Sequence, residues 1–339
     1  MDWQNLKNNQ QDWQIFKLRS ELIGRIRAFF EKAGFLEVQT PLLSPALVPE
    51  SYLEVFQTEL KDKLGNSAPA FLTPSPELWH KKLLAAGSGN IFEITKSFRN
   101  TDLGGRFHLP EFTLLEWYRT GADYFDTMED CQELIRSAAS GNKLFYQGKS
   151  VNLTPPFERI SIIEAFAKYA GIDDKTLFDK KSLVSWALKN NYRISLEDDW
   201  EMVYNLVFLK EIEPKLGFGR PTIIYDFPAE FAPLAKTNPK DSRVKERFEL
   251  YIAGVELADA YSELTDPIEQ KKQFEKEVKL RRKMDKLEHP VDWDFIKALE
   301  SGLPDCSGVA LGVDRLIMLL ADKTEIGEVV LFGESYVNN

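Results

Sequence analysis

The sequence contains few of the residues that build disulfide frameworks and metal clusters. Its two cysteines, Cys131 and Cys306, lie far apart without a CxxC context, and its three histidines show no metal-ligand spacing. Small secreted scaffolds and structural zinc sites need such residues at short spacings. We therefore expect two ordinary buried thiols, and we expect His80 and His289 to be structural or solvated.

Long apolar runs and an excess of positive charge are also missing. No run of about 18 apolar residues could form a membrane-spanning helix, and the first residues lack the apolar core of a signal peptide. The formal net charge is −10, whereas proteins that bind nucleic acid broadly are usually basic. We expect a soluble, cytoplasmic protein with no membrane partner and with tRNA disfavoured. The charge also serves solubility, and a local basic face is not excluded.

Helix-like and strand-like segments occur in separate blocks, which favours an α+β domain over a βαβ repeat. Apolar residues of 15–33 recur at spacings of three and four, which predicts an amphipathic helix that Gly34 ends before an extended segment at 35–41. We expect further strands at 70–73, 91–95, 112–119, 222–227 and 247–258, and further helices at 76–86, 126–139, 265–287 and 313–322.

Residues 160–215 differ from the rest of the chain. Three stretches in this segment suit helices, with little strand signal between them, and no flexible linker brackets the segment. We expect a helical insertion on the side of a sheet-based core, within a single domain that spans residues 1–339.

Two arginines stand beside glycines at the ends of strand-like runs. Arg99 precedes a glycine-rich loop, and Arg315 follows a glycine-interrupted strand and begins an apolar helix. A surface position or an ion pair at a helix start accounts for either one alone. Guanidinium is nevertheless the group suited to bidentate phosphate recognition, and glycine allows close backbone approach. Both arginines are therefore candidate phosphate ligands.

Carboxylates interrupt an apolar segment between residues 247 and 263. Glu249, Glu256 and Glu263 follow one another at intervals of seven residues. An odd interval in one strand sends side chains to opposite faces, so a bend or bulge would be needed to bring them together. A solvated acidic edge is the alternative, but acids among apolar residues need a metal ion or another cation.

Three blocks together resemble the signature motifs of class II aminoacyl-tRNA synthetases. EKAGFLEVQTPLLSPA resembles motif 1 (about 26–46), with Gly34, Phe35 and Pro41 matching. FRN…RFHLPEFTLLEWY resembles motif 2 (about 92–119), and GVALGVDRLIMLL resembles motif 3 (about 306–332). The resemblance implies the fold of that family, a mainly antiparallel sheet flanked by helices, and a homodimer whose interface motif 1 builds.

Within this class, the segments PELWHKKLLAAG, HLPEFTLLEWY and ELADAYSELTD look most like the lysyl branch. The motif 1 helix begins near residue 15, so we do not expect the anticodon-binding barrel of that branch. A lysyl-type chain of this form resembles the ligases that attach (R)-β-lysine to a lysine side chain of elongation factor P. Ser75 and Ala310 replace the alanine and glycine of lysyl-tRNA synthetases. An added methyl group in the close-packed pocket would hinder an α-amino group, which suits a substrate whose amine is on the β-carbon instead.

The resemblance implies ATP and Mg²⁺ as cofactors and gives the matching residues roles in a nucleotide site. Arg99 would bridge the substrate carboxylate and the α-phosphate, and Phe112 would stack on adenine. Arg315, with Arg106 or His108, would hold the γ-phosphate. The remaining matches are the Mg²⁺ ligands Glu249 and Glu256 and the ATP-site residues Asn100, Asp102 and Gly312.

The resemblance also implies an amino-acid site. Glu77 would meet the amine nearest the carboxylate, while Glu116, Tyr118 and Glu263 would bind the distal ammonium. A buried ammonium needs such acceptors, and an apolar pocket could not select it. The remaining matches are Ser75, Asp259 and Ala310.

Two segments depart from the pattern of the family. The chain reads FRNTDLGG where synthetases read FRNE, so Thr101 replaces the acid that contacts adenine. Either Asp102 takes its place after a loop shift or the contact is weakened. The family's NGF becomes Asp259-Ala260-Tyr261, which would change the charge beside the substrate amine.

Three functions are compatible with these motifs. The first is ATP-dependent ligation of (R)-β-lysine or lysine to elongation factor P. The second is a lysyl-tRNA synthetase-like enzyme that charges tRNA or a similar acceptor with α-lysine. The third is a regulatory paralogue without catalysis, against which Arg99, Glu249, Glu256 and Arg315 argue by their presence.

Overall fold

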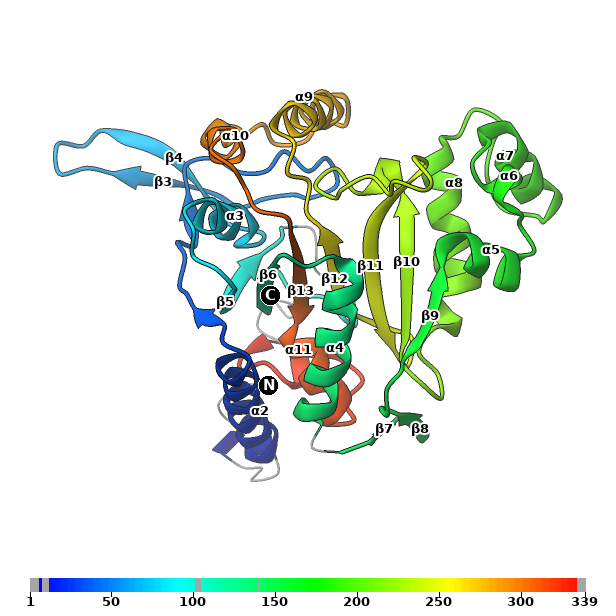
Figure 1. The fold of residues 1–339 in the computed structure, drawn as a ribbon, viewed down its shortest axis with the longest axis horizontal. Helices are drawn as coiled ribbons and strands as arrows, with labels where there is room; N and C mark the ends of the chain where they lie inside the picture. The colour runs from blue at the N-terminus through cyan, green and yellow to red at the C-terminus, as the bar shows by residue number, and fades with distance from the viewer. Residues whose placement is uncertain (1–5, 8–11, 101–104, 140, 334–339) are drawn as a thin grey trace.

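A mainly antiparallel sheet of eight strands runs through the structure, which is a computed structural model that describes residues 6–7, 12–100, 105–139 and 141–333. The strand order is β1-β5-β6-β13-β12-β11-β10-β9 (Figure 1). The outermost pairs are parallel, and the pairs between them are antiparallel. The strands are β1 Leu36–Glu37, β5 Ile91–Phe98, β6 Glu111–Thr120, β9 Glu158–Ser161, β10 Thr222–Pro228, β11 Val244–Ile252, β12 Val255–Ser262 and β13 Cys306–Gly312. The expected α+β class is confirmed.

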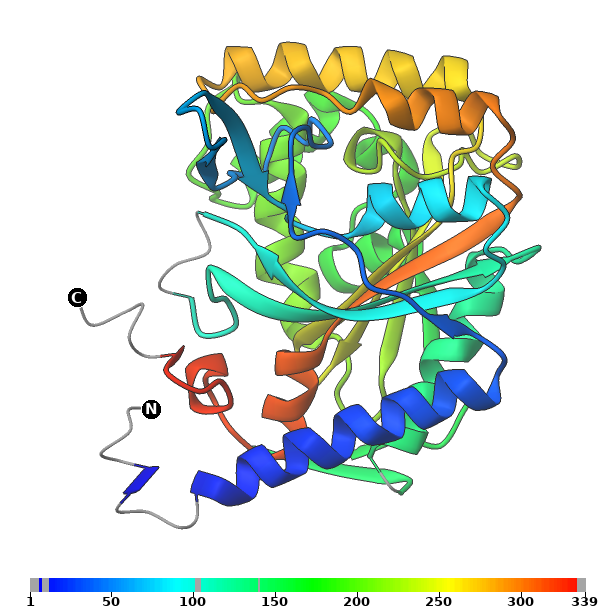
Figure 2. The same cartoon turned by 90° about the vertical axis from the view of Figure 1, so that its left-hand side faces the viewer.

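Helices cover both faces of this sheet. Successive side chains of β6 point to opposite faces, which determines which of its residues lie on each side. Trp117 points to the face where α2 packs, with its ring centroid 5.2 Å from that of Phe30. Glu116 and Tyr118 therefore point to the opposite face, where α3 lies. Figure 2 shows α2 below the sheet and α9 and α10 above it. The helices of the core are α2 Asp12–Lys32, α3 Glu77–Ala85, α4 Tyr124–Ala138, α9 Pro267–Lys283, α10 Trp293–Glu300 and α11 Val313–Leu320.

Local signals explain where several helices begin and end. Asp123 caps α4 in a reciprocal capping box with Asp126, and Asp266 caps α9 directly before Pro267. The first long helix ends before Gly34, whose φ of 79° suits a residue without a side chain. The helix expected over 15–33 is therefore confirmed.

The segment in which a helical insertion was expected consists mainly of helices. Its helices pack around their own apolar cluster, which includes Phe166 and Tyr204 and reaches Ile224 of β10 and Tyr251 of β11. The insertion thus lies beside the β10–β9 edge of the sheet (Figure 1). Its elements are α5 Ile162–Ala170, α6 Asp174–Leu177, α7 Lys180–Lys189, α8 Trp200–Val207, the π-helix η1 Phe208–Ile212 and the 3₁₀ helix η2 Glu213–Lys215.

One expected strand is corrected by the structure. The apolar run 247–258 is not one strand, because Ala253 and Gly254 turn the chain between β11 and β12 with φ values of 53° and 79°. Two consecutive residues with positive φ are typical of a tight hairpin turn. This hairpin, together with a register shift at Leu250/Tyr251, supplies the bend that the acid spacing required.

Smaller elements lie outside the main sheet. A three-stranded sheet of order β2-β4-β3 projects at the far left of Figure 1, and β7 and β8 form a hairpin. These strands are β2 Leu43–Ser44, β3 Gln57–Lys61, β4 Ser67–Leu72, β7 Lys143–Tyr146 and β8 Lys149–Asn152, and the remaining 3₁₀ helices are η3 Ala229–Phe231 and η4 Ile326–Glu328. Cys131 and Cys306 are buried free thiols, as expected. Within the described ranges, no helix combines the length and apolarity needed to cross a membrane.

Candidate active site

Two adjoining cavities lie against the central strands β6, β12 and β13. The larger has a volume of about 450 Å³ and extends from α3 to the helical insertion. The smaller has a volume of about 160 Å³ and extends to the start of α11. Five residues line both cavities, so a ligand in one can touch a ligand in the other: Arg99, Leu114, Glu256, Asp259 and Ala310.

Arg99 lies at the junction of the two cavities, directly after β5. Its backbone N–H donates to the carbonyl of Pro110 at 3.0 Å, and its guanidinium carbon lies 5.3 Å from the centroid of the Phe112 ring. Its Nε is buried and has no hydrogen-bond partner among the described residues. A guanidinium held against an aromatic face, with a donor to spare, is suited to an anion that both cavities share.

Arg315, in the first turn of α11, brings a second guanidinium to the smaller cavity. It donates to the backbone carbonyls of Phe107 at 3.2 Å and of Glu256 at 2.8 Å, and it lies 2.9 Å from Nε2 of His108. Gly312 caps the same helix and lines the cavity beside it. Because backbone groups hold Arg315, its charge is positioned before any ligand binds.

Glu249 and Glu256 come together through the β11–β12 hairpin. The bulge pairs Tyr251 with Glu256, which places the two acids within electrostatic reach of each other. Burial raises the pKa of Glu249 to about 8; Arg247 opposes this shift, and the charge of Glu256 adds to it. Two neighbouring carboxylates of this kind would be stabilised by a cation.

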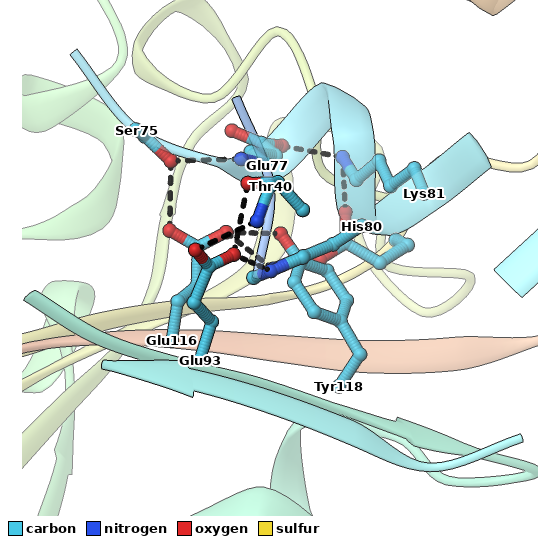
Figure 3. Close-up of polar contacts among 9 residues, drawn as sticks. Thr40, Ser75, Glu77, His80, Lys81, Glu93, Glu116 and Tyr118 are labelled. Atoms are coloured by element: carbon cyan, nitrogen blue, oxygen red, sulfur yellow. Dashed lines mark hydrogen bonds and ion pairs between the residues drawn. The ribbon is translucent and has the colours of Figure 1, made fainter. Parts of the chain in front are cut away.

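The acids expected in the amino-acid site converge beneath α3, as Figure 3 shows. Glu116 accepts hydrogen bonds from Ser75 at 2.7 Å and from the Tyr118 hydroxyl at 2.9 Å. Glu77 lies at the start of α3, and its pKa is raised, chiefly by burial. Burial also raises the pKa of Glu263 to about 8. These residues line the larger cavity, which therefore has a strongly acidic wall.

Lys81, which the sequence analysis missed, neutralises part of this wall. Its Nζ is fully buried and lies 2.5 Å from a carboxylate oxygen of Glu77 and 2.5 Å from one of Glu263. Burial alone would lower the pKa of Lys81, but the two carboxylates raise it, so the side chain stays charged. Among the described residues, Oε1 of Glu263 has no hydrogen-bond donor. The four-residue interval from Glu77 to Lys81, one helical turn, was the available signal.

His80 occupies the next position on α3 and is also fully buried. Its Nε2 lies 2.8 Å from Glu93, and its Nδ1 lies 3.4 Å from Glu116. Burial alone would lower the pKa of His80, but its contacts with Glu116 and Glu93 raise it to about 9. The histidine is thus buried and paired rather than solvated, and it lies directly behind a residue of the candidate site.

Asp259, which stands where the family has asparagine, is a paired charge. Arg247 donates to both of its oxygens, at 2.8 and 3.1 Å, and the Tyr261 hydroxyl donates to it at 2.9 Å. The same arginine donates to Glu249 at 2.6 Å. Arg247, which the sequence analysis missed, is therefore one cation shared by two acids, and the expected change in pocket charge stays a prediction. Ala310 pairs with Asp259 in the neighbouring strand.

Several residues assigned to the nucleotide site lie away from the cavities. Asn100 is exposed and donates its backbone N–H to Glu54. Arg106 donates to the carbonyl of Thr324 at 3.2 Å, its guanidinium lies over the Phe107 ring, and it lines neither cavity. Of Arg106 and His108, therefore, His108 is the one that lines the smaller cavity. Thr101 and Asp102 lie outside the described residues.

Comparisons with known proteins agree with this geometry. The chain matches the family described as tRNA synthetases class II (D, K and N) over residues 2–336. Proteins named elongation factor P–(R)-β-lysine ligase are similar to it. That of Sodalis glossinidius (strain morsitans) is 39% identical over 318 residues, which cover 93% of each chain. That of Vibrio parahaemolyticus serotype O3:K6 (strain RIMD 2210633) is 38% identical over 338 residues, which cover 98% of each chain. The chain belongs to the class II (D, K and N) tRNA synthetase family.

Proposed function

We propose that this protein uses ATP to activate (R)-β-lysine as its adenylate and transfers the β-lysyl group to a lysine side chain of elongation factor P. The similar proteins are named for this activity, and their similarity covers nearly the whole length of the chain. The observation that carries the proposal in the structure is the acidic cavity that meets a second cavity at the guanidinium of Arg99.

The charge of the acidic wall supports a substrate with two ammonium groups. The cluster beneath α3 contains four carboxylates, from Glu77, Glu93, Glu116 and Glu263. Lys81 and His80 compensate two of them, which leaves two negative charges within this described cluster when all groups are ionised. A diamino acid supplies two matching cations, whereas a buried charge without a partner is strongly unfavourable.

The junction between the cavities supports in-line adenylation. The substrate carboxylate lies at Arg99, with its amines in the larger cavity and the triphosphate of ATP in the smaller one. A carboxylate oxygen attacks the α-phosphorus, and the bond to the bridging oxygen of pyrophosphate breaks. No side-chain base is needed because the nucleophile is already ionised. Arg99 and Arg315 position the reactants and balance the charge that develops on the phosphates.

In the second step the neutral amine of the acceptor lysine attacks the carbonyl carbon of the mixed anhydride. The new amide bond forms as the bond from the carbonyl carbon to the phosphate oxygen breaks, AMP leaves, and the amine nitrogen releases one proton to solvent. The larger cavity continues from Arg99 to Tyr204 and Phe208 of the helical insertion, which supports an approach from that side.

Glu249 and Glu256 fit a Mg²⁺ site. Mg²⁺ in nucleotide enzymes commonly binds one or two carboxylates together with substrate phosphates rather than an all-protein cage. Among the described residues, no group of three or more histidine, cysteine or acidic side chains could hold a metal, so a Mg²⁺ ion at these two acids would need phosphate oxygens as further ligands. Bound there, Mg²⁺ would neutralise phosphate charge.

A homodimer is part of the proposal. Leu36, Leu42 and Leu43 of the motif 1 segment are 57%, 37% and 42% exposed. Apolar side chains exposed next to one another suit a protein–protein contact. Light scattering of the purified protein would show twice the mass of the 339-residue chain if this segment joins two copies.

Pyrophosphate release with labelled (R)-β-lysine or (S)-α-lysine, with and without elongation factor P, tests the proposal. We expect a preference for (R)-β-lysine and transfer of the label to the factor. A preference for α-lysine with transfer only to tRNA would instead support the synthetase-like alternative. Absence of turnover with either amino acid would support a regulatory paralogue.

A further inference from the structure

His80 has no role in the mechanism above and does not line either cavity, yet it is fully buried beside the amino-acid site. It lies above two carboxylates that face each other across neighbouring strands, since Glu93 of β5 pairs directly with Glu116 of β6. Like charges at directly opposed positions of a sheet destabilise each other. A cation between them removes this repulsion.

Polar contacts run through His80: its Nε2 is hydrogen-bonded to Glu93, while its Nδ1 lies at ion-pair distance from Glu116 without a hydrogen bond among the described residues. On one side, Glu93 accepts from the backbone N–H of Thr40 at 3.0 Å and from its hydroxyl at 2.8 Å. On the other side, Glu116 accepts from Ser75 and Tyr118, and the ring of His80 meets that of Tyr118 edge-on at 5.4 Å. Figure 3 shows these contacts beneath α3. Glu93 is thus fully occupied by Thr40 and His80, while Glu116 faces the cavity.

The other charged groups of the cluster pair with one another and leave His80 to these two acids. Lys81, the next residue of α3, binds Glu77 and Glu263. The nearest charged partners of His80 on the packed strands are Glu93 and Glu116. Without a charged imidazole, two buried carboxylates would face each other with no cation between them, and their repulsion would push Glu116 away from its place beside Ser75 and Tyr118. A displaced Glu116 would be a poorer acceptor for an ammonium group.

We propose that His80 is a positioning residue for amino-acid selection: its imidazolium lies between Glu93 and Glu116, offsets the repulsion between these carboxylates and holds Glu116 toward the substrate amine. This inference rests on the proposed function, and it identifies the residue that supports Glu116 in the amino-acid site. His80 acts through Glu116 and does not touch the substrate.

The test compares His80→Leu, Glu93→Gln and the double variant in pyrophosphate exchange and lysine binding. His80→Leu should raise the KM for the diamino acid by at least about tenfold, the scale of a lost charge-assisted hydrogen bond, with the KM for ATP unchanged. In the double variant the opposing charge of Glu93 is gone as well, so Glu116 should return to its position and most of the affinity should return. A role in packing alone predicts no such rescue, and equal affinity in His80→Leu would also overturn the proposal.

A second measurement does not depend on activity and also covers a His80→Leu variant that fails to fold. The NMR titration of His80 in the wild-type protein should show an imidazolium up to about pH 9, and Glu93→Gln should lower this value. A neutral His80 at pH 7 would contradict the proposal. Failure of the proposed function would look different, because wild-type protein with a charged His80 would then bind no diamino acid.

Discussion

The two cavities arrange charge in opposite ways. In the larger cavity, buried carboxylates outnumber the lysine and histidine beside them, and burial raises the pKa of Glu263 to about 8. In the smaller cavity, Arg315 is anchored by backbone carbonyls and keeps its charge at any ordinary pH. The amino-acid side therefore depends on protonation, whereas the nucleotide side depends on fixed guanidinium groups. Substitutions and pH should affect the two sides differently.

The largest effect should come from the junction. Arg99→Ala removes the guanidinium that both cavities share, so adenylation should fall by about 10³-fold, the scale of a lost preorganised donor to developing charge. Arg106→Ala is the matched control, because Arg106 donates to Thr324 outside the cavities. Pyrophosphate exchange should distinguish the two variants clearly. Comparable losses in both would contradict the assigned positions.

A substitution in the larger cavity should act on the amino acid alone. A methyl group on Gly308 would collide with the Tyr118 ring and the Glu263 carboxylate. We therefore expect Gly308→Ala to raise the KM for lysine by about 100-fold, as overpacking forces these groups apart, without changing the KM for ATP. Ala310→Gly, two residues along the same strand, removes a methyl group and should leave the acids in place. A changed KM for ATP in Gly308→Ala would show that the cavities are not separate.

Removal of the metal should affect the smaller cavity first. Glu256→Gln should lower activity by about 100-fold at limiting Mg²⁺ and by less at saturating Mg²⁺, because a lost carboxylate ligand weakens metal binding. Titration of activity against Mg²⁺ measures this shift. Glu111→Gln, at the far end of β6, serves as a control acid that lines neither cavity. An unchanged Mg²⁺ requirement in Glu256→Gln would remove this residue from the metal site.

The smallest effect is a proton linkage. Because Glu263 has a pKa of about 8 in the protein without substrate, it is largely protonated at pH 7. A bound ammonium favours the carboxylate, so binding of lysine should release protons, and affinity should rise by at most about tenfold between about pH 7 and about pH 8 for one linked proton. Calorimetry in two buffers of different ionisation enthalpy counts the protons. Proton uptake on binding would contradict the assignment.

The sequence predicted the elements with strong local signals and the charged residues that the motifs contain. The helix ending before Gly34, the helices of the 160–215 segment, Arg99 and Arg315 are where the patterns placed them. The hairpin at Ala253 was missed because its two strands read as one apolar run, although Gly254 marked the turn. Lys81 and Arg247 were missed for a different reason. Each has a partner in another element, Glu263 for Lys81 and Asp259 for Arg247, so only the fold shows that these ordinary charged positions are buried and paired.

Pyrophosphate exchange with a series of amino acids tests the central claim most directly, since the claim is that two uncompensated charges select two ammonium groups. The series should compare (R)-β-lysine and α-lysine with norleucine, which keeps the carboxylate and one amine but lacks the distal ammonium. We predict exchange with the diamino acids and at least about 10³-fold less with norleucine, because its apolar end would leave buried acids unpaired. Comparable exchange with norleucine would contradict the account.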